Sequence, residues 1–216
     1  MKFAISYSCG KDSALALLRM KNSGHEPVCM ITTINEEAER SWFHGVDYEL
    51  MRAVSDGLSI PLIMCLCNGD NYNIEFEKCL LSARNMGAEA CVFGDIDIDS
   101  HLEWNTNRCE AAQIQCILPL WKESRETVVS ETIDSGMKAI IKCVDLSVMD
   151  VSFLGETLTH ELVRRILDTG ADICGENGEY HTLVCDGPVF QHPIEIMLGE
   201  KLDFGTHSVI DIRKRH

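Results

Sequence analysis

The first polar loop of the chain carries residue types that could hold a phosphate group. It reads Ser8-Cys9-Gly10-Lys11-Asp12-Ser13 and follows an apolar run with strand character. Where such a loop opens a helix, free backbone N–H groups and the helix dipole favour an anion. Gly10 lets the backbone approach a ligand, Lys11 adds a positive charge, and the hydroxyls of Ser8 and Ser13 can donate to phosphate oxygens. The loop therefore predicts a phosphate-binding site.

This loop differs from the G-x-x-x-x-G-K-[ST] loop of kinases and GTPases, because it has one Gly and because Asp12 follows Lys11. A purely structural explanation is that Asp12 and Ser13 cap the first helix. That explanation leaves Gly10 and Lys11 without a reason, so we favour phosphate binding. We expect Lys11 to lie on a solvent-facing loop, where its charge has no structural partner.

Three later segments carry polar residues that could complete a site. Gly94 and Asp95 end an apolar run, Arg108 and Glu110 lie on a predicted helix, and the third segment reads Gly175-Glu176-Asn177-Gly178-Glu179-Tyr180-His181-Thr182. Taken alone, two Glu residues next to Gly favour a solvated acidic turn.

Apolar periodicity predicts that strands alternate with helices through the first part of the chain. We expect strands over 2–7, 27–34, 60–66 and 90–93 and one that ends at Leu120, and helices over 13–20, 46–58, 74–86 and 105–112. This alternation indicates a parallel sheet covered on both faces. It continues with a helix over 124–135 and a strand over 138–144.

The alternation weakens after Asp145. Only a helix over 158–167 and short strand-like runs at 194–198 and 209–212 follow. We therefore expect a first domain of residues 1–125 and a second of residues 126–216. The second domain should pack on the first, because no low-complexity linker separates them.

Composition excludes several classes of protein. The 34 Asp plus Glu outnumber 19 Lys plus Arg, and the formal net charge of -15 repels a nucleic-acid backbone. The 11 Cys form no C-x-x-C pair, so a structural zinc site is not expected. No signal-peptide pattern and no apolar run of about 20 residues is visible, so we expect a soluble, cytoplasmic protein without a membrane partner.

The first loop resembles the S-G-G-K-D-S signature of the N-type ATP pyrophosphatases in the PP-loop superfamily, with Cys9 where that family usually has Gly. Together with the three later segments, it makes almost the whole chain resemble the diphthine-ammonia ligase family. The most specific part is Glu-x-Gly-Glu-Tyr-x-Thr. Asn177 and His181 stand where diphthine-linked members typically have Gly and Glu. A bacterial subgroup with the Asn-Gly-Glu-Tyr-His-Thr version has been linked to cobalamin metabolism.

The resemblance implies an α/β fold with a parallel, doubly wound sheet of the adenine nucleotide alpha hydrolase-like (HUP) type. Residues 1–125 would be the ATP pyrophosphatase domain, and residues 126–216 a smaller α+β substrate-binding domain. ATP and Mg2+ are the implied cofactors. In the implied reaction, an acceptor carboxylate attacks the α-phosphorus of ATP, pyrophosphate leaves into the first loop, and ammonia displaces AMP from the acyl-adenylate.

The same resemblance implies roles for individual residues. The catalytic set is Lys11, Asp12, Glu176 and Glu179. ATP would contact Ser8, Cys9, Gly10, Lys11, Asp12, Ser13, Gly94 and Asp95, with Asp12 and Asp95 nearest to the metal. The acceptor would contact Arg108, Glu110, Asn177, Gly178, Tyr180, His181 and Thr182. His44 and His101 stand alone on loops, and we expect both to be bystanders.

The implied partners are ammonia and a carboxylate acceptor, first of all the diphthine residue of translation elongation factor 2. The departures at Asn177 and His181 leave a different, cobalamin-related carboxylate as an alternative. A tRNA-modifying PP-loop enzyme is a further alternative, although the acidic composition speaks against it. A non-catalytic ATP-binding module is the last, although Lys11, Asp12 and Glu179 are all retained. The oligomeric state stays open, with a homodimer as one option.

Overall fold

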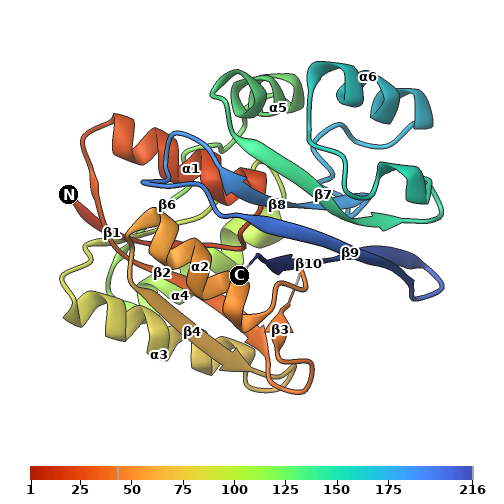
Figure 1. The fold of residues 1–216 in the computed structure, drawn as a ribbon. Coiled ribbons are helices and arrows are strands. Elements are labelled where there is room, and N and C mark those ends of the chain that lie inside the picture. Colours follow the sequence, from red (N-terminus) through yellow and green to blue (C-terminus); the bar gives the residue numbers. More distant parts are fainter. Residues whose placement is uncertain (43, 216) are drawn as a thin grey trace.

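The first half of the chain forms a mostly parallel sheet in a computed structural model that describes residues 1–42 and 44–215. This sheet A has its parallel strands in the order β4-β2-β1-β5-β6, and β3 pairs antiparallel with the end of β2 (Figure 1). The strands are β1 (Lys2–Ser6), β2 (Glu26–Asn35), β3 (Arg40–Ser41), β4 (Leu62–Cys67), β5 (Ala90–Val92) and β6 (Gln115–Ile117).

Four helices cover the two faces of sheet A. They are α1 (Lys11–Asn22), α2 (Tyr48–Leu58), α3 (Tyr72–Asn85) and α4 (Asp99–Ala112). Alternate residues of a strand point to opposite faces. Phe3 and Ile5 of β1 accordingly belong to one apolar cluster with α1 and α2, whereas Ala4 belongs to another with α3 and α4. The predicted doubly wound α/β fold is confirmed.

The loops that follow β1 and β5 lie side by side. β1 pairs with β2 on one side and with β5 on the other, so the direction of strand order reverses between β1 and β5. Ligands of doubly wound sheets bind at such a switch point, beyond the carboxyl ends of the strands. The polar loop at residues 8–13 and the pair Gly94 and Asp95 flank this position.

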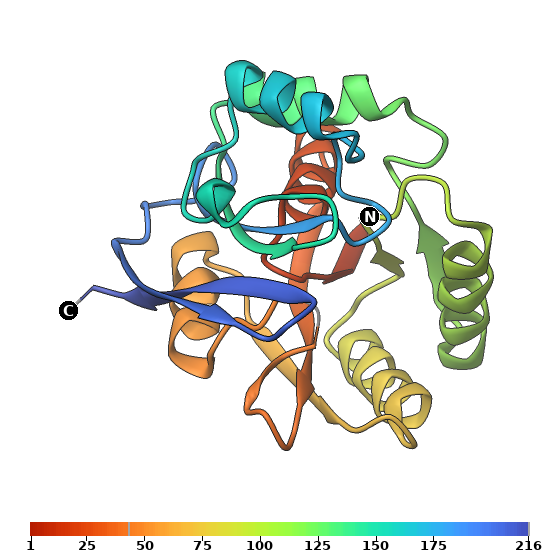
Figure 2. The same cartoon turned by 90° about the vertical axis from the view of Figure 1, so that its right-hand side faces the viewer.

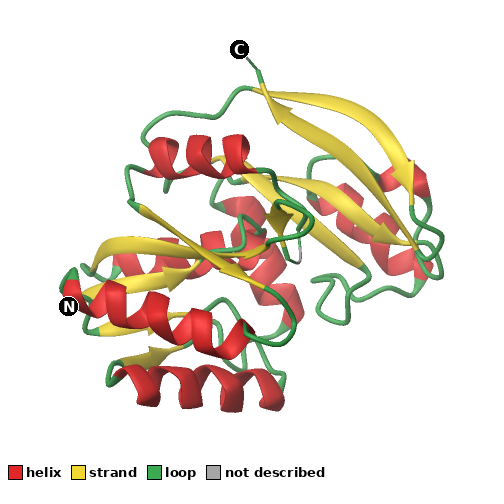
Figure 3. Cartoon of the chain, turned by 90° about the horizontal axis from the view of Figure 1, so that it is seen from below, coloured by secondary structure: helices red, strands yellow, loops and turns green. Residues whose placement is uncertain are grey.

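The second half of the chain forms an antiparallel sheet B (Figure 2). Its strands are β7 (Lys138–Asp145), β8 (Tyr180–Asp186), β9 (Ile196–Asp203) and β10 (His207–Lys214), in the order β8-β7-β10-β9. The helices α5 (Arg125–Asp134) and α6 (His160–Thr169) lie on one side of this sheet, and the short helix η1 (Val151–Phe153) follows β7. Figure 3 shows β9 and β10 as a long hairpin at the margin of sheet B.

Sheet B corrects the expectation for residues 138–144. They do not continue the parallel alternation, because β7 pairs antiparallel with both β8 and β10. The sequence also gave no sign of β8, whose first residues belong to the Gly- and Glu-rich segment.

The two sheets share one apolar core. Phe3 and Leu15 from the first half and Val128, Ile141 and Tyr180 from the second belong to the same buried cluster. Arg19 of α1 forms an ion pair at 2.5 Å with Glu131 of α5. Helix α5 follows the predicted boundary but packs on α1, so the apolar core does not separate residues 1–125 from residues 126–216. The division into two domains after residue 125 stays a prediction. None of the helices among the described residues is long and apolar enough to cross a bilayer.

Candidate functional site

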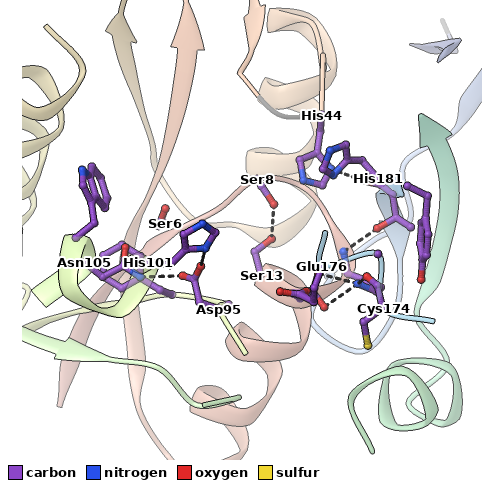
Figure 4. A pocket seen from close by; sticks show the side chains of 18 of the residues that line it. Ser6, Ser8, Ser13, His44, Asp95, His101, Asn105, Cys174, Glu176 and His181 are labelled. Carbon is purple, nitrogen blue, oxygen red and sulfur yellow. Dashed lines mark hydrogen bonds and ion pairs between the residues drawn. The ribbon is translucent and has the colours of Figure 1, made fainter. Parts of the chain in front are cut away.

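A cavity of about 400 Å³ opens at the switch point of sheet A (Figure 4). Its walls come from the loop after β1, the end of β5 with α4, and the segment around the start of β8. The lining residues are Ser6, Ser8, Lys11, Asp12, Ser13, His44, Tyr72, Phe93, Gly94, Asp95, His101, Trp104, Asn105, Cys174, Gly175, Glu176, Tyr180, His181 and Thr182. The cavity thus unites segments that lie up to 176 positions apart in the chain, from Ser6 to Thr182.

The first loop turns sharply into α1. Cys9 has φ of 68°, in the left-handed region that favours Gly, which explains the Gly usual at this position. Its side chain is buried in the core, away from the cavity. The hydroxyls of Ser8 and Ser13 both line the cavity and lie 3.3 Å apart. They are placed to meet an anion at the N-terminus of α1.

Gly10 makes room for an imidazole ring. A Cβ atom at Gly10 would clash with Cε1 of His44, which comes from the loop between β3 and α2. Gly94 has a similar role, because a Cβ there would lie 2.8 Å from the backbone of Asp12 and Ser13. Both glycines are therefore required by close packing around the first loop.

The second half of the chain holds the first loop in place. The backbone N–H of Lys11 donates to Thr182 Oγ1 at 3.0 Å, and the Val184 N–H donates to the Cys9 carbonyl at 2.8 Å. Lys11 Nζ also donates to the carbonyl of Cys174. Strand β8 and the residues before it therefore complete the phosphate loop.

Lys11 is buried, which corrects the expectation of a solvent-facing side chain without a partner. It is 3% exposed, and its ammonium lies 2.8 and 2.9 Å from the two carboxylate oxygens of Asp12. Burial is the largest single influence on the pKa of Lys11 and acts to lower it, but Asp12, together with smaller contributions from Tyr180, Cys174 and Glu176, outweighs burial and holds this pKa above its usual value. A fixed positive charge is thus present at the phosphate loop at any physiological pH.

Glu176 is a nearly buried carboxyl group in the cavity wall. Its side chain is 13% exposed, and burial together with the negative charge of Asp12 raises its pKa to about 7. Lys11 and Arg125 act in the opposite direction. Arg125 Nη1 lies 3.6 Å from Glu176 Oε2, while its Nε contacts Asp172 at 3.1 Å. Arg125 is the first residue of α5, and no sequence motif singled it out.

Asp95 is fixed by two neighbours on α4. Its Oδ1 lies 2.9 Å from His101 Nδ1, and its Oδ2 accepts from Asn105 Nδ2 at 2.8 Å. The hydrogen bond to Asp95 raises the pKa of His101. His101 was expected to stand alone on a loop, but it lies on α4 and lines the cavity.

His44 and His181 meet over the first loop, from opposite halves of the chain. Their ring centroids are 4.8 Å apart, and His44 Nδ1 lies 2.7 Å from the carbonyl of Thr182. Burial lowers the pKa of His44 to about 3 and that of His181 to about 4. Both rings are neutral near pH 7. His44 was expected to stand alone on its loop, but it lines the cavity beside His181.

An aromatic surface closes the side of the cavity nearest α3 and α4. Tyr72, Phe93 and Trp104 line it, and the Tyr72 and Trp104 ring centroids are 5.7 Å apart. Such a surface can stack on a flat heteroaromatic ring. The sequence did not single these residues out, because aromatic residues at helical spacing are usually core residues.

Several predicted site residues do not belong to the described lining of the cavity. They are Cys9, Gly10, Arg108, Glu110, Asn177, Gly178 and Glu179. Arg108 forms an ion pair with Glu77 at 2.7 Å, and Glu110 is exposed on α4. Neither side chain is among the described residues that line the cavity. Their contact with the acceptor stays a prediction.

Glu179 holds the shape of the segment before β8. Its carboxylate accepts from the backbone N–H groups of Asp172 and Asn177 at 3.2 and 3.0 Å, and from Asn177 Nδ2 at 3.0 Å. Partial burial acts to raise the pKa of Glu179, but these hydrogen bonds hold it below its usual value. The carboxylate therefore fixes a turn, and Glu176 is the one that lines the cavity.

Three carboxyl groups, those of Asp12, Asp95 and Glu176, line the cavity. Within the described part of the chain, no group of three or more His, Cys, Asp or Glu residues is arranged to hold a metal ion by itself. Mg2+ needs only one or two carboxylates when phosphate oxygens and water supply its other ligands. The donor set thus fits an ion that arrives with a polyphosphate.

Comparisons with known proteins match nearly the whole chain to one family. The family model of the diphthamide synthase N-terminal domain matches residues 1–116, and that of the C-terminal domain matches residues 124–216. The diphthine--ammonia ligase of Danio rerio is 26% identical over 88% of this chain and 84% of its own length. The human diphthine--ammonia ligase is 25% identical over 90% and 82%.

A solved structure was also matched, the predicted subunit of tRNA methyltransferase from Methanocaldococcus jannaschii DSM. It has a TM-score of 0.47 and 16% identity, over 90% of this chain and all of that one.

Proposed function

The chain belongs to the diphthamide synthase family, and on that premise we propose that it is an AMP-forming ligase that uses ATP to join ammonia to the carboxylate of diphthine. One observation carries this proposal more than any other. The phosphate loop and the segment with Glu176 line a single cavity and are joined by the hydrogen bond from the Lys11 N–H to Thr182. Nucleotide and acceptor chemistry can therefore take place in one space.

ATP would lie with its phosphates at the N-terminus of α1 and its base towards Tyr72 and Trp104. In the first step, an oxygen of the acceptor carboxylate attacks the α-phosphorus, and the bond to the β-phosphate oxygen breaks. The pyrophosphate that leaves gains negative charge, which the fixed ammonium of Lys11 stabilises. Bound Mg2+ would neutralise further phosphate charge, and Asp12 and Asp95 are the carboxylates that would hold it.

Ammonia then attacks the acyl carbon, and the bond to AMP breaks. The nitrogen must lose one proton to yield the neutral amide. Glu176 would accept this proton, because it faces the cavity and a pKa of about 7 suits transfer in both directions near neutral pH. Glu179 would act indirectly, through the turn that it holds.

The residues on the acceptor side of the cavity favour a second candidate acceptor, a carboxylate other than diphthine. His181 and His44 are neutral, where diphthine-linked relatives typically have Glu at the position of His181. A carboxylate acceptor without a fixed cation, such as a cobalamin precursor, would suit this surface.

The test is to incubate the purified protein with ATP, Mg2+, ammonium and diphthine-bearing elongation factor 2. We expect AMP, pyrophosphate and the amidated factor in equal amounts, measured by chromatography and mass spectrometry. Cobalamin-precursor carboxylates serve as parallel acceptors. Amidation of these alone would select the alternative acceptor, and release of neither AMP nor pyrophosphate with any acceptor would indicate a protein that only binds ATP.

A further inference from the structure

One cross-strand row of sheet B runs from the cavity to the free margin of the sheet. Cys143 of β7 pairs with His181 of β8 on one side and with Val209 of β10 on the other, and Val209 pairs with Leu202 of β9. Residues directly opposite each other in antiparallel strands point to the same face. His181 lines the cavity, so Val209 and Leu202 lie on the same face of the sheet as this wall.

The far end of the row is apolar and open to solvent. Leu202 is 42% exposed, and Phe204, two residues further on, is 68% exposed, the largest value among the exposed large apolar side chains described. The Phe204 N–H donates to the carbonyl of His207 at 2.9 Å, so the turn after β9 is held against β10. We call Val209, Leu202 and Phe204 the strip.

The strip lies close enough to the cavity for a protein bound on the strip to reach the cavity. Three strand spacings separate His181 from Leu202, roughly 14 Å in all. Asp145 and Glu200 lie two positions from Cys143 and Leu202 along their strands and therefore on the same face as the strip, and the chain as a whole has a net charge of -15. A complementary partner would present apolar side chains with basic groups around them.

We propose that the strip is the docking surface for the protein that carries the acceptor carboxylate, which would present an apolar patch with a basic rim. The proposal rests on the proposed function, in which the acceptor is a side chain of a protein. A protein that docks over Phe204 and Leu202 would present its neighbouring side chains within roughly 14 Å of His181 in the cavity wall. Exposed apolar groups that are contiguous with a site often mark such a surface.

The test uses the double variant Leu202→Ser/Phe204→Ser. Its matched control is Leu81→Ser/Leu167→Ser, because these residues of α3 and α6 are 43% and 62% exposed and lie outside the strip. The Kd of the diphthine-bearing factor is measured by titration calorimetry, and the KM values of the factor, ATP and ammonium by pyrophosphate release. We expect the strip variant to raise the Kd and KM of the factor about tenfold or more, with the KM values of ATP and ammonium unchanged.

The control pair should bind the factor as the wild type does. An unchanged Kd in the strip variant, when the wild type amidates the factor, overturns the docking surface and leaves the proposed function standing. A wild type that neither binds nor amidates the factor overturns both. If sedimentation shows a wild-type dimer that the strip variant converts to a monomer, the strip is an interface between two copies and the proposal is wrong.

Discussion

Thr182 of β8 accepts the backbone N–H of Lys11 through its hydroxyl, at 3.0 Å and across 171 positions of the chain. Its carbonyl lies 2.7 Å from His44 Nδ1. One residue of the second half therefore fixes both the start of α1 and the imidazole that packs on Gly10. Strand β8 therefore holds the phosphate loop and His44 in a fixed arrangement.

Replacing Thr182 by Val should weaken the attachment of β8 to the phosphate loop. Val keeps the shape but leaves the buried Lys11 N–H without an acceptor, which costs about 1–3 kcal/mol of unfolding free energy. Thr182→Ser keeps the hydroxyl and should stay near the wild type. Denaturant unfolding and the Kd of pyrophosphate measure the two effects. Thr132→Val is the control, since this buried residue lies on α5, and loss of pyrophosphate affinity in it would contradict a specific role of Thr182.

Lys11→Met should abolish pyrophosphate release and also lower stability, because the ammonium is buried against Asp12. Removing one partner of such a pair costs on the order of 3 kcal/mol. The double variant Lys11→Met/Asp12→Asn should recover much of the melting temperature but none of the activity. Wild-type turnover in either variant would show that Lys11 does not stabilise the leaving pyrophosphate.

The nucleotide products should be AMP and pyrophosphate, without ADP and phosphate. The reason is that the loop at the start of α1 can hold two linked phosphates that leave together. Ion-exchange chromatography of the spent nucleotide decides this. ADP as the main product would place the reaction at the γ-phosphate and remove the acyl-adenylate from the proposed function.

Glu176→Gln should change how stability depends on pH. The folded protein holds the Glu176 proton with a pKa of about 7, against the usual 4.5, so its stability falls as pH rises from about 4.5 to 7. Gln has no such proton. At pH 8 the variant should therefore be more stable than the wild type by about 3 kcal/mol, and at pH 4.5 the two should be nearly equal.

Chemical denaturation at several pH values, without nucleotide or metal, measures this difference. The variant should also lose most amide formation, because the proton acceptor is gone. A stability difference that does not change with pH would show that the Glu176 carboxyl group titrates as an ordinary exposed one.

His181→Glu should improve the use of diphthine. The neutral ring gives way to a carboxylate that attracts the trimethylammonium group of this acceptor, a gain of about 1 kcal/mol for a partly desolvated pair. The KM of diphthine-bearing factor should fall several-fold, while the KM of ATP stays the same. Efficient amidation by the wild type with no gain in the variant would show that position 181 does not read the acceptor.

The sequence by itself determined the phosphate loop and the fold around it. Ser8 to Ser13 follow a strand and open a helix, and both facts depend on local residue types and on the alternation of strands with helices. The doubly wound sheet follows from the same local alternation. Glu176 was found only through the family resemblance of its motif, because two Glu residues next to Gly by themselves favour a solvated acidic turn.

The tertiary structure alone decided which motif residues reach the cavity. Glu176 and Glu179 are three positions apart and chemically alike, yet one lines the cavity and the other accepts hydrogen bonds from Asp172 and Asn177. His44 and Arg125 carry no local signal, because their partners Thr182 and Asp172 are distant in the chain. Burial and pairing depend on which segments pack together, and one-dimensional spacing does not contain that information.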